Sequence, residues 1–475
     1  MKKGQNILRK ITLAKLLFVI GAFLFLCFPY FAHAVENLGE GLTRFSNTRK
    51  VIYQPGMGRY WMFYNLGTEF GYRSYDNQSL TDFTEVFPAG DLSGDQNPGT
   101  DGSVWHVEAS SYVYVVVGDD NIDITATNGG VDDMFVRRGL LNADGSITWG
   151  SLSEKNPMPT TFPWRNSGYG DPISKGHSGG IALVDNTITA VVGGLGEEEN
   201  VLGVIRAYYG FVGMSGISNN ATMSGGDNIG FGNGDRVSSL LTTLPENEAG
   251  VVPVNDGGIW RSLISYMSDG AAPRLYVDAF TGSARTKELL LAVRFPPDSP
   301  NGDGLSMAVD PTGNSYAYLA YINDAGELKY TRRTGFELWD SIVTVDVDGA
   351  AALTPYLNPS IGFLNGATDK VYIVYTSTYG SLNYAVGDAI ASPIWTITRD
   401  WQPAGEYPNI PIFNEFPFPI PVTYSSGGNA YLDFLICSTY NDPQITSVTL
   451  DPSEPANPWL TKQSYKIKIT GTDFL

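Results

Sequence analysis

Residues 305–330 read LSMAVDPTGNSYAYLAYINDAGELKY, and residues 359–384 read PSIGFLNGATDKVYIVYTSTYGSLNY. The two stretches match in a single register, in which Ser306 corresponds to Ser360 and Tyr318 corresponds to Tyr372. An offset of 54 residues that is kept through the whole stretch marks an internal repeat. This repeat decides the fold class.

Each copy of the repeat predicts short antiparallel strands. Runs that alternate apolar and polar residues are separated by turns that contain glycine, such as 324–326 and 378–380. Tyr, Val, Ile and Thr suit a pleated, half-buried surface. Four such strands in about 50 residues are typical of one blade of a β-propeller. Because a single blade cannot bury both of its apolar faces, we expect the blades to pack around a central axis.

Weaker copies of the same pattern fill much of the remaining chain. They occupy residues 49–86, 102–149, 179–210 and 251–295. Together with the two strong copies they make six units, and a strand pair within 420–436 remains. We expect the segment 35–45 to complete that pair and close the ring. The prediction is therefore an all-β, seven-bladed propeller over residues 35–441, with six blades as the alternative.

The first 34 residues have the pattern of a removed signal peptide. Five basic residues precede an apolar run from Leu16 to Phe28, and Ala32-His33-Ala34 is a small-x-small cleavage site. The apolar run is shorter than the roughly 20 residues that a bilayer span needs. We therefore expect a secreted or cell-surface protein, with the periplasm as an alternative, and no membrane insertion after cleavage.

Charge and cysteine content narrow the classes of partner and cofactor. The formal charge of −19 disfavours binding to nucleic acid. Cys437 is the only cysteine after residue 34, so the mature chain forms no internal disulfide. Histidine and cysteine are too few for a zinc site, and we expect no metal and no cofactor. Structural calcium is the alternative, in the loop 299–310 or beside Asp91, Asp95 and Asp101.

Residues 142–149, which read NADGSITW, resemble the Asp-box of sialidase-like propellers. The motif of that family is S-x-D-x-G-x-T-W, and Asn142 stands here in place of the serine. The resemblance implies a structural role rather than a catalytic one, for the residues Asn142, Asp144, Gly145, Thr148 and Trp149. The Asp144 carboxylate is expected to accept backbone N–H groups across the hairpin, and Trp149 is expected to pack between sheets.

Residues 443–452 and 465–474 resemble the start of an IPT/TIG immunoglobulin-like domain. That family begins with P-x-I-x-x-V/I-x-P and continues to an I-x-G-x-x-F strand. The match is too short for a complete sandwich. We expect residues 442–475 to be the incomplete start of such a domain, with a plain β tail as the alternative.

Candidate ligand-binding residues are arginines and aromatic residues near predicted strand ends. An aromatic plane beside polar groups suits the apolar face of a sugar ring, and arginine can clamp a carboxylate. The candidates are Arg137, Arg138, Trp164, Arg165, Tyr169 and Trp401. Their alternative roles are surface ion pairing for the arginines and packing under the rim for the aromatic residues. The catalytic residues cannot be named from the sequence.

A sialidase would also imply an early R-I-P motif, whereas this chain reads Arg49-Lys50-Val51 in that region. We therefore expect a non-catalytic recognition module that binds a glycan or another extracellular polymer. It is expected to be a monomer or part of a longer multidomain chain. A sialidase-like glycoside hydrolase and an architectural surface protein are the two alternatives, because fold alone does not determine function.

Overall fold

The computed structural model describes the chain in segments. The described residues are 36–40, 49–65, 70–76, 80–83, 102–106, 110–118, 134–150, 153–155, 180–184, 187–199, 205–218, 227–231, 250–268, 274–281, 284–293, 304–310, 316–347, 357–366, 368–377, 379–415, 419–435, 444–450 and 467–472. The predicted signal peptide, residues 1–34, lies outside them. The chain divides into two compact units, one of which comprises Ala32–Phe416 and Pro421–Phe434.

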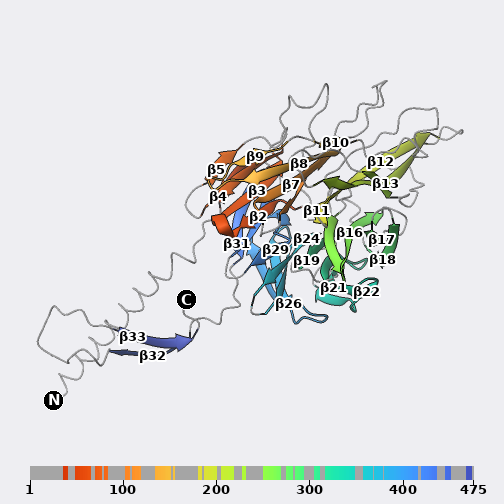
Figure 1. Cartoon of the computed structure of the whole chain (residues 1–475). Helices are drawn as coiled ribbons and strands as arrows, with labels where there is room; N and C mark the ends of the chain where they lie inside the picture. Colours follow the sequence, from red (N-terminus) through yellow and green to blue (C-terminus); the bar gives the residue numbers. More distant parts are fainter. Residues whose placement is uncertain are drawn as a thin grey trace, which may run out of the picture. The chain divides into compact units, whose positions relative to one another are not determined.

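Six antiparallel sheets in that unit are built mainly from one stretch of chain each (Figure 1). Sheet 1 contains β2 (Val51–Gln54), β3 (Arg59–Asn65), β4 (Phe70–Tyr75) and β5 (Leu80–Phe83). Sheet 2 contains β6 (Gly102–His106), β7 (Tyr112–Gly118), β8 (Met134–Leu141), β9 (Ile147–Trp149) and β10 (Ser153–Lys155). Sheet 3 contains β11 (Ile181–Val184), β12 (Thr187–Glu199), β13 (Ile205–Ser218) and β14 (Asp227–Phe231).

The next three sheets continue the same order along the chain. Sheet 4 contains β15 (Gly250–Asp256), β16 (Ile259–Ser268), β17 (Arg274–Thr281) and β18 (Ala284–Ala292). Sheet 5 contains β19 (Leu305–Val309), β20 (Ala317–Ile322), β21 (Leu328–Gly335), β22 (Leu338–Trp339) and β23 (Val343–Asp346). Sheet 6 contains β24 (Leu357–Asn365), β25 (Lys370–Thr376), β26 (Leu382–Asp388), β27 (Thr396–Gln402) and β29 (Phe413–Glu415).

A further four-stranded sheet joins the two ends of the ring, and we call it the closing sheet. It contains β1 (Glu36–Glu40), β31 (Asn429–Leu435), β30 (Ile420–Ser426) and β28 (Glu406–Asn409), in that order. The predicted pairing between the segment 35–45 and residues 420–436 therefore forms, because β1 pairs with β31. The pairing covers the outer edge of β31, and β1 becomes the outer strand of the closing sheet.

The predicted count of seven blades is wrong, and the ring has six blades, as in the alternative. Six sheets follow the repeat pattern, and the closing sheet differs from them. Its innermost strand leaves the sheet after Asn409, and Phe413–Glu415 then pairs in parallel with β24 of sheet 6. Residues 406–409 therefore pair within the closing sheet, whereas residues 413–415, a few positions later, pair within sheet 6.

The first strands of the sheets follow one another around an axis, which defines a β-propeller. In succession β2 contacts β6, β6 contacts β11, β11 contacts β15, β15 contacts β19, β19 contacts β24, and β24 contacts β28. The cycle is completed where the Lys50 backbone N–H donates to Asn409 Oδ1 at 2.9 Å. The all-β propeller predicted from the repeat is confirmed by this cycle.

The repeat of 54 residues is reproduced in strand register. Ser306 pairs with Ala320 in sheet 5, and Ser360 pairs with Val374 in sheet 6. The two pairs therefore correspond, because each residue of the second pair lies 54 residues after its counterpart in the first. Apolar side chains from adjacent sheets form the core, as where Tyr318 and Phe363 stack with ring centroids 5.4 Å apart. Burial of these faces between neighbouring sheets is the main stabilising contribution to the ring.

The second unit contains a two-stranded antiparallel sheet of β32 (Gln444–Leu450) and β33 (Ile467–Thr472). These strands fall in the two stretches that resemble an IPT/TIG domain. Two paired strands do not distinguish that domain from a plain β tail, so the assignment stays a prediction.

Candidate functional site

The axis of the propeller is crossed by one arginine. Arg49 directly precedes β2, and its side chain is only 4% exposed. Its guanidinium donates to Ser360 Oγ at 3.1 Å, to the Ile410 carbonyl at 3.2 Å, and to the Met307 carbonyl. These acceptors belong to β24, β19 and the segment after β28, so Arg49 ties the start of the ring to its last sheets.

Arg49 occupies a position that recurs at the start of the inner strands. Residues in this position accept or donate hydrogen bonds between neighbouring strands around the axis. Ser103 Oγ accepts from Arg49 N at 3.0 Å, Ser306 Oγ accepts from Ile361 N at 3.2 Å, and Ser360 Oγ accepts from Ile410 N at 3.1 Å. In sheet 3 the place is taken by Gly180, where an added Cβ would lie 2.4 Å from Val251 N. The inner strands therefore approach each other closely.

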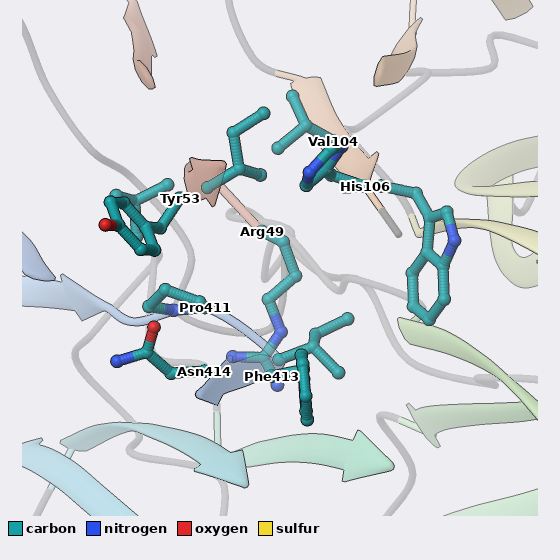
Figure 2. Close-up of a pocket in the computed structure, with 11 residues that line it drawn as sticks. Arg49, Tyr53, Val104, His106, Pro411, Phe413 and Asn414 are labelled. Carbon is teal, nitrogen blue, oxygen red and sulfur yellow. The ribbon is translucent and has the colours of Figure 1, made fainter. Parts of the chain in front are cut away.

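Among the described residues, Arg49 lines two small cavities beside the inner strands. The larger holds about 30 Å³ and lies between β2, β6 and the residues 411–414, where Arg49 extends toward Phe413 and Asn414 (Figure 2). The smaller holds about 10 Å³ and is bordered by β11, β15 and β19. The larger has room for about two water molecules, which is far less than a sugar ring needs. Neither cavity has an aspartate or glutamate among its described lining residues.

The larger cavity has a basic and aromatic lining. Burial lowers the pKa of Arg49 to about 9, because the guanidinium is desolvated in a site where its acceptors are neutral. Burial also lowers the pKa of His106 to about 4, although its Nδ1 lies 2.9 Å from the Tyr112 carbonyl oxygen. His106 is therefore neutral at pH 7, with Nδ1–H donating to that carbonyl.

The predicted Asp-box forms the hairpin between β8 and β9. Asp144 Oδ1 accepts from the Ser146 backbone N–H at 2.9 Å and from Ser146 Oγ at 2.6 Å, and the hydrogen bonds from Ser146 lower the pKa of Asp144. Asn142 Nδ2 donates to Thr148 Oγ1 at 3.0 Å. Trp149 packs against the core between sheets 1 and 2. The contacts are those of a structural turn.

This hairpin also fastens sheet 2 to sheet 1. The Trp61 Nε1–H donates to the Gly145 carbonyl at 2.9 Å, and the Ile147 backbone N–H donates to Tyr72 Oη at 2.9 Å. Each of these two hydrogen bonds joins a side chain of sheet 1 to the backbone of sheet 2. The hairpin therefore has a role in packing the ring.

The three predicted ligand-binding residues that the structure describes, Arg137, Arg138 and Trp401, lie in two different sheets. Arg137 lies over the Trp149 ring at 5.5 Å, and Arg138 lies over the Tyr112 ring at 4.3 Å, both in sheet 2. Trp401 lies on β27 of sheet 6, with its ring edge-on to Tyr384 at 5.9 Å. Trp164, Arg165 and Tyr169 lie outside the described residues, as do Asp91, Asp95, Asp101 and residues 299–303 of the loop 299–310, whereas residues 305–309 of that loop form β19.

The axial role of Arg49 is the feature that sequence reasoning missed. In the sequence, Arg49 stands where the R-I-P motif would begin, but Lys50 and Val51 follow it, and nothing in that motif indicates an axial role. The available signal was its position before the first inner strand, which corresponds to Ser306 and Ser360 in the repeat. The short side chains of Ser306 and Ser360 accept hydrogen bonds from the next inner strand, whereas the longer Arg49 side chain reaches Met307, Ser360 and Ile410.

Over the described part of the chain, no group of three or more histidine, cysteine, aspartate or glutamate side chains is arranged to hold a metal ion. None of the helices found in those residues has the length and apolar character of a membrane span.

No protein-family model matches the chain, and no curated protein matches it in sequence. The solved structures to which it is similar include the BP39L lectin from Burkholderia pseudomallei, at 11% identity over 82% of this chain and 96% of the lectin, with a TM-score of 0.47. They also include the NanB sialidase from Streptococcus pneumoniae, at 12% identity over 85% of this chain and 70% of the sialidase, with a TM-score of 0.39. A third is an endo-arabinase from Bacteroides thetaiotaomicron, at 10% identity over 67% of this chain and all of that chain, with a TM-score of 0.31.

Proposed function

We propose that this chain is a secreted or cell-surface recognition module whose propeller binds carbohydrate without hydrolysing it. The observation that carries the proposal is the closed axis, where Arg49 is bonded to Ser360 and to two backbone carbonyls. The two cavities that the described residues leave beside Arg49, of about 30 and 10 Å³, are too small for a sugar ring. Glycoside hydrolysis would need two carboxyl groups about 5–10 Å apart around such a ring.

Binding to carbohydrate is supported by the surface rather than by the axis. Trp401 is half-buried, and Asp400 next to it is exposed. An aromatic ring beside hydrogen-bonding groups matches the alternation of apolar C–H faces and hydroxyl groups on a sugar. The high negative charge of the chain, −19, keeps such a module soluble and disfavours nucleic acid as its partner.

The test uses the chain from residue 35 onward in two parallel assays. Binding is measured on a broad glycan array and confirmed by calorimetry, and hydrolysis is measured with chromogenic glycosides that include a sialoside. The proposal predicts binding without release of product. Release of sugar at a rate above that of the Arg49→Ala variant would favour the hydrolase alternative, and a chain that binds no glycan would favour the architectural one.

A further inference from the structure

One hairpin of sheet 6 presents an aromatic side chain on a rigid support. The turn between β25 and β26 is held by Ser377, whose backbone N–H donates to the Ser381 carbonyl at 2.7 Å. Ser377 Oγ accepts from the backbone N–H groups of Tyr379 and Ser381, at 3.2 and 3.1 Å. Between these bonds the Tyr379 side chain is 91% exposed. A ring that is fixed at its backbone and free at its face loses little entropy on binding a ligand.

The hairpin is braced by the neighbouring segment that contains the predicted candidate Trp401. Ser381 Oγ donates to Asp400 Oδ1 at 2.6 Å, and the Gly405 backbone N–H donates to the Gly380 carbonyl at 2.9 Å. These bonds hold the segment of Asp400 against the hairpin that carries Tyr379, and Trp401 follows Asp400 in the chain. We call Tyr379, Asp400 and Trp401 the Tyr379 surface.

Backbone strain is concentrated in this segment. Asp400 has φ of 50° and Tyr407 has φ of 52°, and these are two of four non-glycine residues with positive φ in the described chain. For a tyrosine or an aspartate such a conformation costs about 1 kcal/mol or more. The Asp400 backbone N–H donates to Asn383 Oδ1 at 2.8 Å, which helps to hold the strained conformation. Strain of this kind, when held by surrounding contacts, commonly marks a binding surface.

The charge around the hairpin selects the class of ligand. Asp400 and Glu406 are exposed carboxylates, and the chain as a whole carries a formal charge of −19. An exposed carboxylate accepts hydrogen bonds from hydroxyl groups and repels another carboxylate. The surface therefore suits a neutral sugar and disfavours an acidic one.

We propose that the Tyr379 surface is the carbohydrate-binding site, in which the Tyr379 ring stacks on a neutral sugar and Asp400 accepts a hydrogen bond from one of its hydroxyl groups. This inference rests on the proposed function and adds the site and the ligand class to it. Trp401 follows Asp400 on β27, and its ring lies edge-on to the Tyr384 ring.

The first test compares two exposed apolar residues of the same sheet. Tyr379→Ala removes the stacking ring, whereas the control Ile394→Ala removes a side chain that is 92% exposed at the opposite hairpin end of sheet 6. The probes are the methyl glycosides of glucose, galactose, mannose and xylose, measured by calorimetry. We expect Tyr379→Ala to weaken binding of the neutral ligand by about tenfold or more and Tyr379→Phe to retain it. Ile394→Ala should bind as the wild type does.

The second test addresses the ligand class with matched sugars that differ in one carboxylate. Methyl glucoside and methyl galactoside are each compared with the corresponding uronide. We expect the wild type to bind the neutral glycoside more tightly than its uronide. We expect Asp400→Asn to weaken binding of the neutral glycoside several-fold and to reduce the ratio of the two affinities. Asparagine tolerates the φ of Asp400, so the variant keeps the backbone.

The outcomes separate the two proposals. A wild-type chain that binds no sugar contradicts the proposed function, and this inference falls with it. Binding that persists unchanged in Tyr379→Ala, or a preference for the uronide, overturns the inference alone and leaves the binding function in place.

Discussion

Arg333, at the end of β21, is an arginine with no exposed surface whose partners come from the neighbouring sheet. Its Nε donates to Glu288 at 2.7 Å, and its Nη1 donates to Asp256 at 2.8 Å. Hydrogen bonds and charge from these two carboxylates outweigh desolvation and raise the pKa of Arg333. The cluster joins sheet 5 to sheet 4, because the Arg333 guanidinium is paired with both carboxylates. Its contribution to stability depends on all three side chains being present, since loss of one leaves a buried charge without its partner.

Removal of the Arg333 guanidinium should therefore lower the stability of the folded chain strongly. We expect Arg333→Met to lower the free energy of unfolding by about 3–5 kcal/mol, because Glu288 stays buried without its partner. Urea unfolding measures the change. The matched control is Lys370→Met, which breaks the partly exposed ion pair with Asp388 and should cost less than about 1 kcal/mol. Equal effects of the two variants would contradict the role assigned to Arg333.

His106 gives a prediction on pH at the same scale. Burial lowers the pKa of His106 to about 4, below the usual value of about 6.5. As the pH falls, His106 is therefore protonated in the unfolded chain before it is protonated in the folded chain. The part of the unfolding free energy that depends on a neutral His106 is highest above pH 6.5 and decreases as the pH falls toward 4. The loss at pH 4 should reach about 3 kcal/mol at most. Relative to His106→Gln, which has no group that titrates at this position, the wild type should lose unfolding free energy between pH 6.5 and 4. A difference between the two proteins that does not depend on pH would contradict a lowered pKa of His106.

The hairpin between β8 and β9 is the element where backbone conformation matters most. Gly145 has φ of 94°, and a Cβ there would lie 2.0 Å from Ser74 Oγ in the adjacent sheet. We expect Gly145→Ala to lower the free energy of unfolding by about 2–4 kcal/mol, from the left-handed backbone and the clash together. The control is Gly257→Ala in the turn between β15 and β16, where φ is 63° and nothing lies within 4 Å.

That control should cost only about 1 kcal/mol, from the backbone alone. Thermal unfolding of the two variants in the same buffer makes the comparison. If Gly145→Ala were as mild as Gly257→Ala, the hairpin would not be fastened to sheet 1 as described.

The elements that the sequence predicts best are those built from local pattern. The register of β19 with β20 and of β24 with β25 follows the offset between Ser306 and Ser360, because a strand repeat keeps both its turns and its alternation. The turn at Asp144 was also predictable, since its contacts lie within a few residues. Such features depend on neighbours in sequence.

Features that depend on distant residues could not be predicted in this way. Arg49 contacts acceptors more than 250 residues away, and nothing near it in sequence points to them. The parallel pairing of β29 with β24 is equally non-local, and it made the expected count of equivalent blades wrong. Exposure of Tyr379 follows from the position of its hairpin in the sheet, which the alternation pattern does not give.

At the scale of the whole molecule, stability depends on closing the ring without a disulfide. The two cysteines are Cys27, within the predicted signal peptide, and Cys437. Closure relies on the pairing of β1 with β31 and on the bond between Lys50 and Asn409. A closed ring protects the apolar faces of its first and last sheets, which an open ring would leave exposed.

The most direct measurement of this closure is a cross-link between the two chain ends. Glu40 and Asn429 are register partners in the closing sheet, so Glu40→Cys with Asn429→Cys, in a Cys437→Ser background, places two thiols side by side. The control pair, Glu36→Cys with Asn429→Cys, is out of register, since Glu36 pairs with Leu432. On mild oxidation the account predicts an intramolecular disulfide in the first pair only, seen as a monomer that has lost two hydrogens by mass spectrometry. Free thiols in the first pair, or cross-links only between molecules, would contradict a propeller closed by its two ends.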